Sequence, residues 1–177
     1  MMNNTNNISS LNNFNNPPPV TTYPFRILTL NVQGLNSKFK QEQLISMIKS
    51  DHISIMGLSE TKLRPNQSRF IYKHIDDYSF YFNNDSDSVH GSGVGLIVSN
   101  SYSKYIQKSN GYKGRVIYID LFMKGNVKLR IIQTYLHANF TGNRAEIEDL
   151  QRYIFILLDQ ANNSPWKQLL WVTLIAA

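Results

Sequence analysis

The chain has 177 residues, of which 42% are apolar, which is enough for one globular domain with its own core. It contains no cysteine, which excludes disulfides and thiolate metal sites and is consistent with a reducing, intracellular compartment. The 18 Lys and Arg residues against 12 Asp and Glu give a net charge of +6, which favours a polyanionic partner but is equally expected of a merely basic protein.

The first 24 residues differ in composition from the rest of the chain. They carry no charged side chain, include eight Asn residues and contain the run Pro17 to Pro19. This composition predicts a disordered tail, and it lacks the basic start and continuous apolar run of a secretory signal. The apolar run at 169–177 is shorter than the roughly 20 residues that span a bilayer. We therefore expect a tail over 1–24, a domain over 25–177 and no membrane association, with nuclear and cytoplasmic locations both open.

From residue 25 onward, apolar residues recur with the periods of strands and helices in turn. The pattern predicts strands at 26–32, 53–58, 78–82, 94–99, 115–122, 128–135 and 169–175, and helices at 41–50 and from about 143 to 162. The later strands are expected to pair antiparallel, because their connections are too short for a crossover helix. The segment 108–114, KSNGYKG, is interpreted as a loop. The whole pattern predicts an α/β protein with mixed sheets covered by helices.

Two short apolar strands each end in a polar side chain, Asn31 after ILTL and Glu60 after ISIMGLS. Ligands of open α/β sheets bind at the carboxyl edge of the strands, so this pair predicts a site there. A carboxylate at such an edge can hold Mg²⁺, which prefers oxygen ligands. Each residue also has a simpler interpretation. Glu60 could cap a turn or face water, and Asn31 with Gly34 could form a turn.

The order LNVQGL, a helix, LSETKL, the glycine-led strand GSGVGLIVSN and then IIQTYLHAN resembles the endonuclease/exonuclease/phosphatase superfamily. Within it, the chain is most similar to nuclease domains of non-LTR retrotransposons and their reverse-transcriptase-linked relatives. The resemblance implies a DNase I-like sandwich of two sheets flanked by helices. It covers the N-terminal part of the family pattern, so we expect a C-terminally truncated domain.

The resemblance also implies roles for individual residues. Glu60 and Asn31 are expected to hold Mg²⁺ or Mn²⁺, and Tyr135 to donate its hydroxyl to a phosphate oxygen as charge develops. Tyr135 could instead be an ordinary amphipathic residue at a strand end. Asn139 resembles the family's next asparagine, although it lies four residues after Tyr135 where three are expected. Many relatives carry Asp or Asn at the position of Gln33, so no metal role is assigned to it.

Basic residues near these positions are candidates for contact with a polyanion. Arg115 and Lys62 are expected to bind the substrate, and His137 is assigned no more than a phosphate contact. Tyr72 and Tyr112, interleaved with basic residues, could stack on sugars or bases. A solvated basic loop explains the same residues equally well. The nearby glycines Gly91, Gly93 and Gly95 are expected to mark a bulge or close strand approach.

The family's later G-D-x-N and S-D-H motifs have no counterpart here, since the chain reads LLWVTLIAA where the first would follow. Residues that act as a catalytic unit are lost together. The sequence therefore predicts a fragment of an Mg²⁺-dependent phosphodiesterase, by ancestry a nuclease acting on DNA, with little or no activity by itself. Two alternatives stay open: a non-catalytic nucleic-acid-binding or interaction fragment, and a phosphatase of phosphoinositides or small phosphodiesters. Removal of the later strands also predicts unpaired sheet edges and poor solubility.

Overall fold

The computed structural model describes residues 24–84, 92–136, 144–163, 165 and 167–174. The elements of this part of the chain are, in order, β1 (Ile27–Asn31), α1 (Lys38–Ser50), β2 (Ile55–Ser59), α2 (Pro65–Ser68), β3 (Tyr78–Asn83), β4 (Val94–Ser99), α3 (Asn100–Ser103), β5 (Ile106–Tyr112), β6 (Val116–Met123), β7 (Val127–Leu136), α4 (Arg144–Asn162) and β8 (Lys167–Leu174).

The strands form two four-stranded sheets. The first has the order β1-β2-β4-β3, with β1 and β2 parallel and the other pairs antiparallel. The second has the order β5-β6-β7-β8, with β7 and β8 parallel. Each parallel pair is joined by a crossover helix, α1 in the first sheet and α4 in the second. The two sheets therefore share a plan in which hairpins extend one parallel pair.

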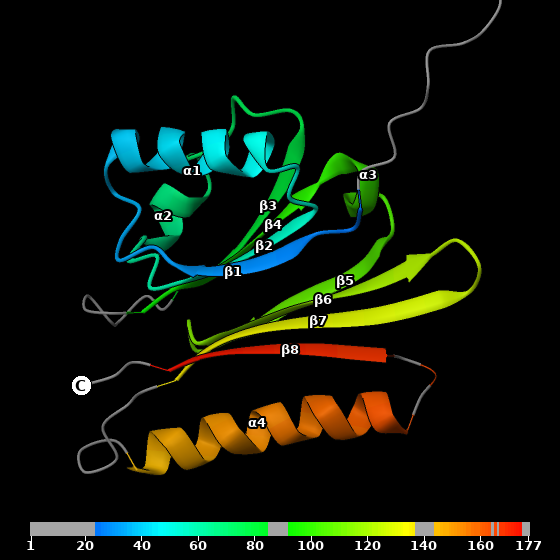
Figure 1. The fold of residues 1–177 in the computed structure, drawn as a ribbon. Coiled ribbons are helices and arrows are strands. Elements are labelled where there is room, and N and C mark those ends of the chain that lie inside the picture. The colour runs from blue at the N-terminus through cyan, green and yellow to red at the C-terminus, as the bar shows by residue number, and fades with distance from the viewer. Residues whose placement is uncertain (1–23, 85–91, 137–143, 164, 166, 175–177) are drawn as a thin grey trace, which may run out of the picture.

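The sheets face each other, with α1 over the outer face of the first and α4 over the outer face of the second, as Figure 1 shows. Ile55, Leu96, Ile119 and Ile131 belong to the core between the sheets. A second cluster lies between α1 and the first sheet, and a third between α4 and the second sheet. Successive residues of β2 alternate between two of these cores, since Ile55 faces the other sheet and Met56 belongs to the α1 cluster. This alternation explains why Ile55, Met56 and Leu58 are all apolar: β2 is buried on both faces.

The predicted α/β class and two-sheet sandwich are confirmed, and so is antiparallel pairing of the later strands. The interpretation of 108–114 as a loop is wrong, because residues up to Tyr112 belong to β5. This strand is at the edge of its sheet and most of its side chains are exposed, so it lacks the apolar alternation that predicts a strand. α1 begins at Lys38, three residues before the predicted helix, and the short α2 and α3 were not predicted.

Close strand approach, predicted for the glycines, is confirmed at Gly95, where an added Cβ would lie 2.8 Å from the Phe82 ring. Gly91 lies outside the described residues, and the predicted tail over 1–24 falls almost wholly outside them, since they begin at 24. None of the helices in the described part of the chain is long and apolar enough to cross a membrane.

Candidate metal and phosphate site

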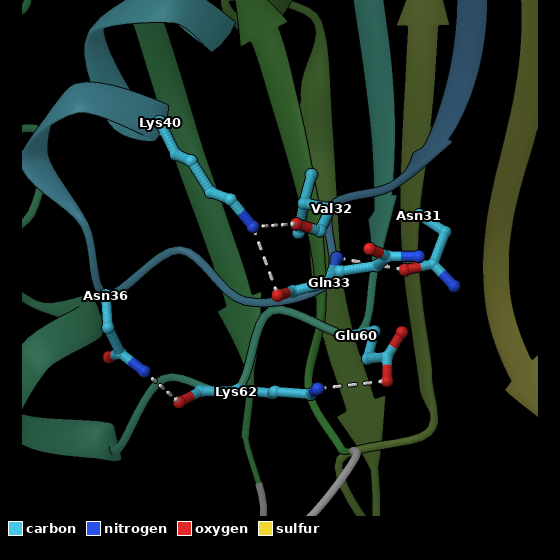
Figure 2. A network of polar contacts seen from close by, with 7 residues as sticks. All are labelled: Asn31, Val32, Gln33, Asn36, Lys40, Glu60 and Lys62. Carbon is cyan, nitrogen blue, oxygen red and sulfur yellow. Dashed lines mark hydrogen bonds and ion pairs between the residues drawn. The ribbon is translucent and has the colours of Figure 1, made fainter.

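The site lies where β1 and β2 end together. In their parallel register Asn31 is opposite Ser59, so Asn31 and Glu60 leave the sheet at the same edge. The loops that follow are tied to each other, since Gly34 N–H donates to Glu60 O at 2.8 Å and Leu35 N–H to Thr61 O at 2.9 Å. The sequence prediction that the two side chains meet at one carboxyl edge is confirmed, and Figure 2 shows both at this edge.

The backbone at this edge holds an uncommon conformation. Gln33, Glu60 and Lys62 have positive φ values of 47°, 58° and 53°. A non-glycine residue in this region costs on the order of 1–3 kcal/mol, and such residues cluster at functional sites. Hydrogen bonds hold the second loop in place, from Thr61 N–H to Gly93 O and from Lys62 N–H to Ser92 O, both 3.0 Å. The direction of the Glu60 side chain is therefore imposed by the surrounding chain.

Glu60 interacts with residues of both sheets. Its side chain is 18% exposed and forms an ion pair with Lys62, with Nζ 3.2 Å from Oε1. The phenol of Tyr135, which is on β7, lies within reach of the negative charge of the Glu60 carboxylate. Tyr135 is fully buried, and its burial, together with the negative charge of Glu60, raises the pKa of its phenol to about 12. The phenol therefore stays protonated and able to donate at neutral pH.

Arg115 is buried beside the ring of Tyr135. Its guanidinium carbon lies 5.1 Å from the ring centroid, and the residue is 5% exposed. The positive charge lowers the pKa of Tyr135 and so opposes the larger effects of burial and of Glu60. A buried guanidinium beside this phenol gives the site an anion-binding component.

A layer of polar side chains lies directly behind Glu60, between the sheets. Thr29 Oγ1 donates to Gln133 Oε1 at 2.9 Å, which links β1 to β7. Gly57 makes room for this pair, because an added Cβ would lie 2.1 Å from Gln133 Oε1. Ser59 lies on the same face of β2 as Gly57 and is fully buried, and its hydroxyl has no hydrogen-bond partner among the described residues. A buried hydroxyl without a partner costs about 1–3 kcal/mol, so it marks a place for a polar ligand such as water.

Asn31 does form the turn that the simpler interpretation predicts. Its Oδ1 accepts from Gln33 N–H at 3.0 Å, and the loop is also held by Lys40, whose ammonium donates to the carbonyls of Val32 and Gln33 at 3.3 Å. An amide oxygen has two lone pairs, so Asn31 can accept this bond and still face a cation or its water. The two interpretations of Asn31 are therefore compatible.

These donors suit a hard cation. Glu60 offers a carboxylate, Asn31 an amide oxygen and Ser59 an unpartnered hydroxyl, all at one strand edge. Magnesium is commonly held by one or two carboxylates, with waters and substrate phosphate oxygens filling the remaining positions. Among the described residues, no three His, Asp or Glu side chains gather into a ready-made metal site. The residues present thus fit a weakly held Mg²⁺ or Mn²⁺ better than a structural metal.

Not all the predicted site residues meet here. Asn31, Glu60, Lys62, Tyr135 and Arg115 do, whereas Asn139 and His137 lie outside the described residues.

The suggested stacking roles of two tyrosines are wrong. Tyr72 is 4% exposed and stacks on Phe80, and Tyr112 stacks on Tyr153 and bonds Asp149. Both rings are thus held within the fold and are not free for a base.

Sequence reasoning missed the supporting residues Ser59, Thr29, Gln133 and Lys40. A signal existed for two of them, since Gln133 and Thr29 are polar residues inside predicted buried strands. The Lys40 contact depends on the path of the loop after β1, which no local pattern specifies.

Comparison of the sequence with family models and with curated proteins finds no match. Solved structures do match. The AP endonuclease LMAP from Leishmania major is 20% identical with a TM-score of 0.63, over 81% of this chain and 54% of that one. The endonuclease domain of TRAS1, a telomere-specific non-LTR retrotransposon, is 11% identical with a TM-score of 0.54, over 84% and 58%. The mannosyl-6-phosphatase Bt3783 from Bacteroides thetaiotaomicron is 12% identical with a TM-score of 0.59, over 84% and 64%.

The chain spans between 54% and 64% of the length of these three structures. At identities this low the likeness concerns the fold. Because these three proteins are two endonucleases and a sugar phosphatase, the shared fold alone does not select a substrate.

Proposed function

We propose that this chain, which has the DNase I-like fold of the endonuclease/exonuclease/phosphatase superfamily, carries part of the site of a divalent-metal-dependent phosphodiesterase. One observation carries the proposal. Glu60 leaves the sheet edge beside Asn31 in a left-handed backbone conformation, and its carboxylate interacts electrostatically with the buried Tyr135 of the other sheet. A strained, partly buried carboxylate that links two sheets at their carboxyl edge is typical of a functional position.

Each residue has a role that its surroundings support. Glu60 would hold Mg²⁺ or Mn²⁺, and Asn31 would orient a water or a phosphate oxygen through its amide. When bound, the metal would supply Lewis-acid polarisation of the phosphate and lower the pKa of a water. The Tyr135 phenol, kept protonated by burial, would donate to a phosphate oxygen, and the Arg115 guanidinium behind its ring would stabilise negative charge there.

We propose nucleic acid as the substrate class and DNA as its first candidate. The net charge of +6 supports a polyanion, and two of the similar structures are endonucleases, one of them from a non-LTR retrotransposon. A small phosphate ester or phosphoinositide is the second candidate, which the likeness to a sugar phosphatase supports.

Because the chain spans little more than half of the similar structures, we propose that full activity needs groups outside the part described here. A binding-only protein would keep the fold and basic surface but would not need the Glu60 carboxylate.

Metal binding tests the proposal without requiring turnover. We expect isothermal titration calorimetry with Mn²⁺ to detect one weak site on the full chain. The Glu60→Gln variant should lower the Mn²⁺ affinity of this site at least about tenfold. Glu42→Gln is the matched control, because it removes the same charge from an exposed side chain that forms a surface ion pair with Lys38. Equal Mn²⁺ affinity in the Glu60→Gln variant and the wild type would exclude the proposed metal site.

Substrate class is tested separately. Nicking of plasmid DNA and release of phosphate from inositol lipids are measured side by side, with Mg²⁺ and with a chelator. The substrate class is identified if activity is seen on one of the two substrates and this activity is lost both with the chelator and in Glu60→Gln. DNA binding whose affinity is the same with and without Mg²⁺, and in the wild type and Glu60→Gln, would instead support the binding-only function.

A further inference from the structure

The ion pair between Lys62 and Glu60 places a cation of the chain on the carboxylate that is the proposed metal ligand. Lys62 Nζ lies 3.2 Å from Glu60 Oε1. Magnesium binds a carboxylate oxygen at about 2.0–2.1 Å, so the ammonium and the metal would compete for overlapping space and for the same charge. Two cations cannot share this small volume without strong repulsion.

The position of Lys62 is built into the loop. Its backbone has a φ of 53°, its N–H donates to Ser92 O, and its carbonyl accepts from Asn36 Nδ2 at 3.3 Å. Its aliphatic stem passes Gly34, where an added Cβ would lie 3.5 Å from Lys62 Cδ. Figure 2 shows the side chain extending along the loop toward Glu60. The backbone is thus held on both sides while the ammonium is free to change partners.

The side chains of Glu60 and Lys62 differ in exposure, and the more exposed of the two can more easily change its partner. The Glu60 side chain is 18% exposed and also interacts with Tyr135, whereas the Lys62 side chain is 37% exposed. Lysine carries a compact charge on a flexible four-carbon stem, so it can leave one oxygen for another at little cost. Glu60 therefore stays in place, and Lys62 is the partner that moves.

We propose that Lys62 acts as a stand-in for the metal: it neutralises Glu60 in the metal-free protein and moves to a substrate phosphate when a divalent cation binds. This inference rests on the proposed function, since it takes Glu60 as the metal ligand. It makes Lys62 a positioning residue that lowers metal affinity, whereas a residue that merely attracts polyanions would leave metal affinity unchanged. It also couples metal and phosphate binding, because only the metal-bound protein offers the Lys62 ammonium to an anion.

The test is the Mn²⁺ affinity of the full chain, measured by calorimetry for the wild type and for Lys62→Met. We expect Lys62→Met to bind Mn²⁺ about three- to fivefold more tightly, the change that loss of one competing, partly exposed ion pair would give. Lys62→Arg keeps the charge and should bind within about twofold of the wild type. Lys38→Met is the control for net charge, because Lys38 pairs with Glu42 and its side chain is 85% exposed.

The outcomes separate this inference from the proposed function. If Glu60→Gln loses Mn²⁺ binding but Lys62→Met matches Lys38→Met or binds more weakly, the metal site stands and the role of Lys62 is overturned. If Glu60→Gln binds Mn²⁺ like the wild type, both proposals fail.

A second measurement uses the wild-type protein, so it does not depend on whether a variant folds. Acetylation of lysines, followed by mass spectrometry, should label Lys62 faster with Mn²⁺ than without it, relative to Lys38. An unchanged ratio would overturn the exchange of partners.

Discussion

The buried phenol of Tyr135 makes stability depend on pH in a predictable direction. Its pKa is about 12 in the folded protein, because of burial first and then Glu60, and about 10 in an unfolded chain. A group with a raised folded pKa contributes its stability fully below the unfolded value and loses it as pH rises through the folded value. Between pH 8 and pH 11 the wild type should lose on the order of 1 kcal/mol through this group alone. The loss should be absent in Tyr135→Phe.

Urea unfolding at the two pH values, with a chelator present, measures this difference. The other tyrosines and lysines titrate in both proteins, so their effects cancel in the comparison. An equal loss of stability in the wild type and Tyr135→Phe would mean that the Tyr135 phenol is not held in its neutral form by the fold.

At the scale of elements, α4 is anchored to the second sheet by a buried ion pair. Arg130 of β7 donates to Asp120 of β6 through Nε at 2.7 Å and Nη2 at 2.8 Å, and through Nη1 to Leu157 O of α4 at 3.1 Å. Both side chains are at most 7% exposed. The hydrogen bonds to Asp120 hold the pKa of Arg130 above its usual range, so the guanidinium stays charged. The one guanidinium thus connects three elements.

Removing one partner should be costly, because it leaves a buried charge alone. We expect Asp120→Asn to lower the free energy of unfolding by about 3–5 kcal/mol in urea. The double variant Asp120→Leu, Arg130→Met should recover most of this loss, since it removes both charges. Glu42→Gln on the surface should cost less than about 1 kcal/mol. A small effect of Asp120→Asn would show that water reaches Arg130.

The elements also show how far local pattern can predict the site. Strands buried on one or both faces, such as β2 and β7, have apolar runs that are visible in sequence. Glu60 can be identified because it is the charged residue directly after β2. β5 has no such run, because it is an edge strand with exposed side chains. The interaction between Glu60 and Tyr135 joins residues of different sheets, so it depends on how the sheets face each other. Their common membership of one site could be predicted only through the family resemblance.

For the whole molecule, each sheet has two edge strands, β1 and β3 in the first and β5 and β8 in the second. β3 packs on β5 and β6, and β2 on β7, so the edge strands β1 and β8 lie together on the remaining side (Figure 1). Among the described residues, β1 pairs only with β2 and β8 only with β7. Leu28 and Leu30 of β1 are 45% and 39% exposed, and Leu30 borders a groove of 230 Å³ against α1. An edge with free backbone groups and exposed leucines invites pairing with another chain.

This edge predicts where self-association begins. We expect Leu30→Lys to lower the aggregated fraction of the full chain in sedimentation velocity, because a charged side chain on an edge strand disfavours edge-to-edge pairing. Phe155→Lys on α4 is the control. Phe155 is more exposed, at 68%, but the backbone groups in the middle of a helix are already paired with each other, so its surface offers side-chain contact alone. If association is driven by backbone pairing at β1, Leu30→Lys should reduce it and Phe155→Lys should leave it largely unchanged. The reverse result would place the association on the outer face of α4, and the open edge of the sandwich would then not be its cause.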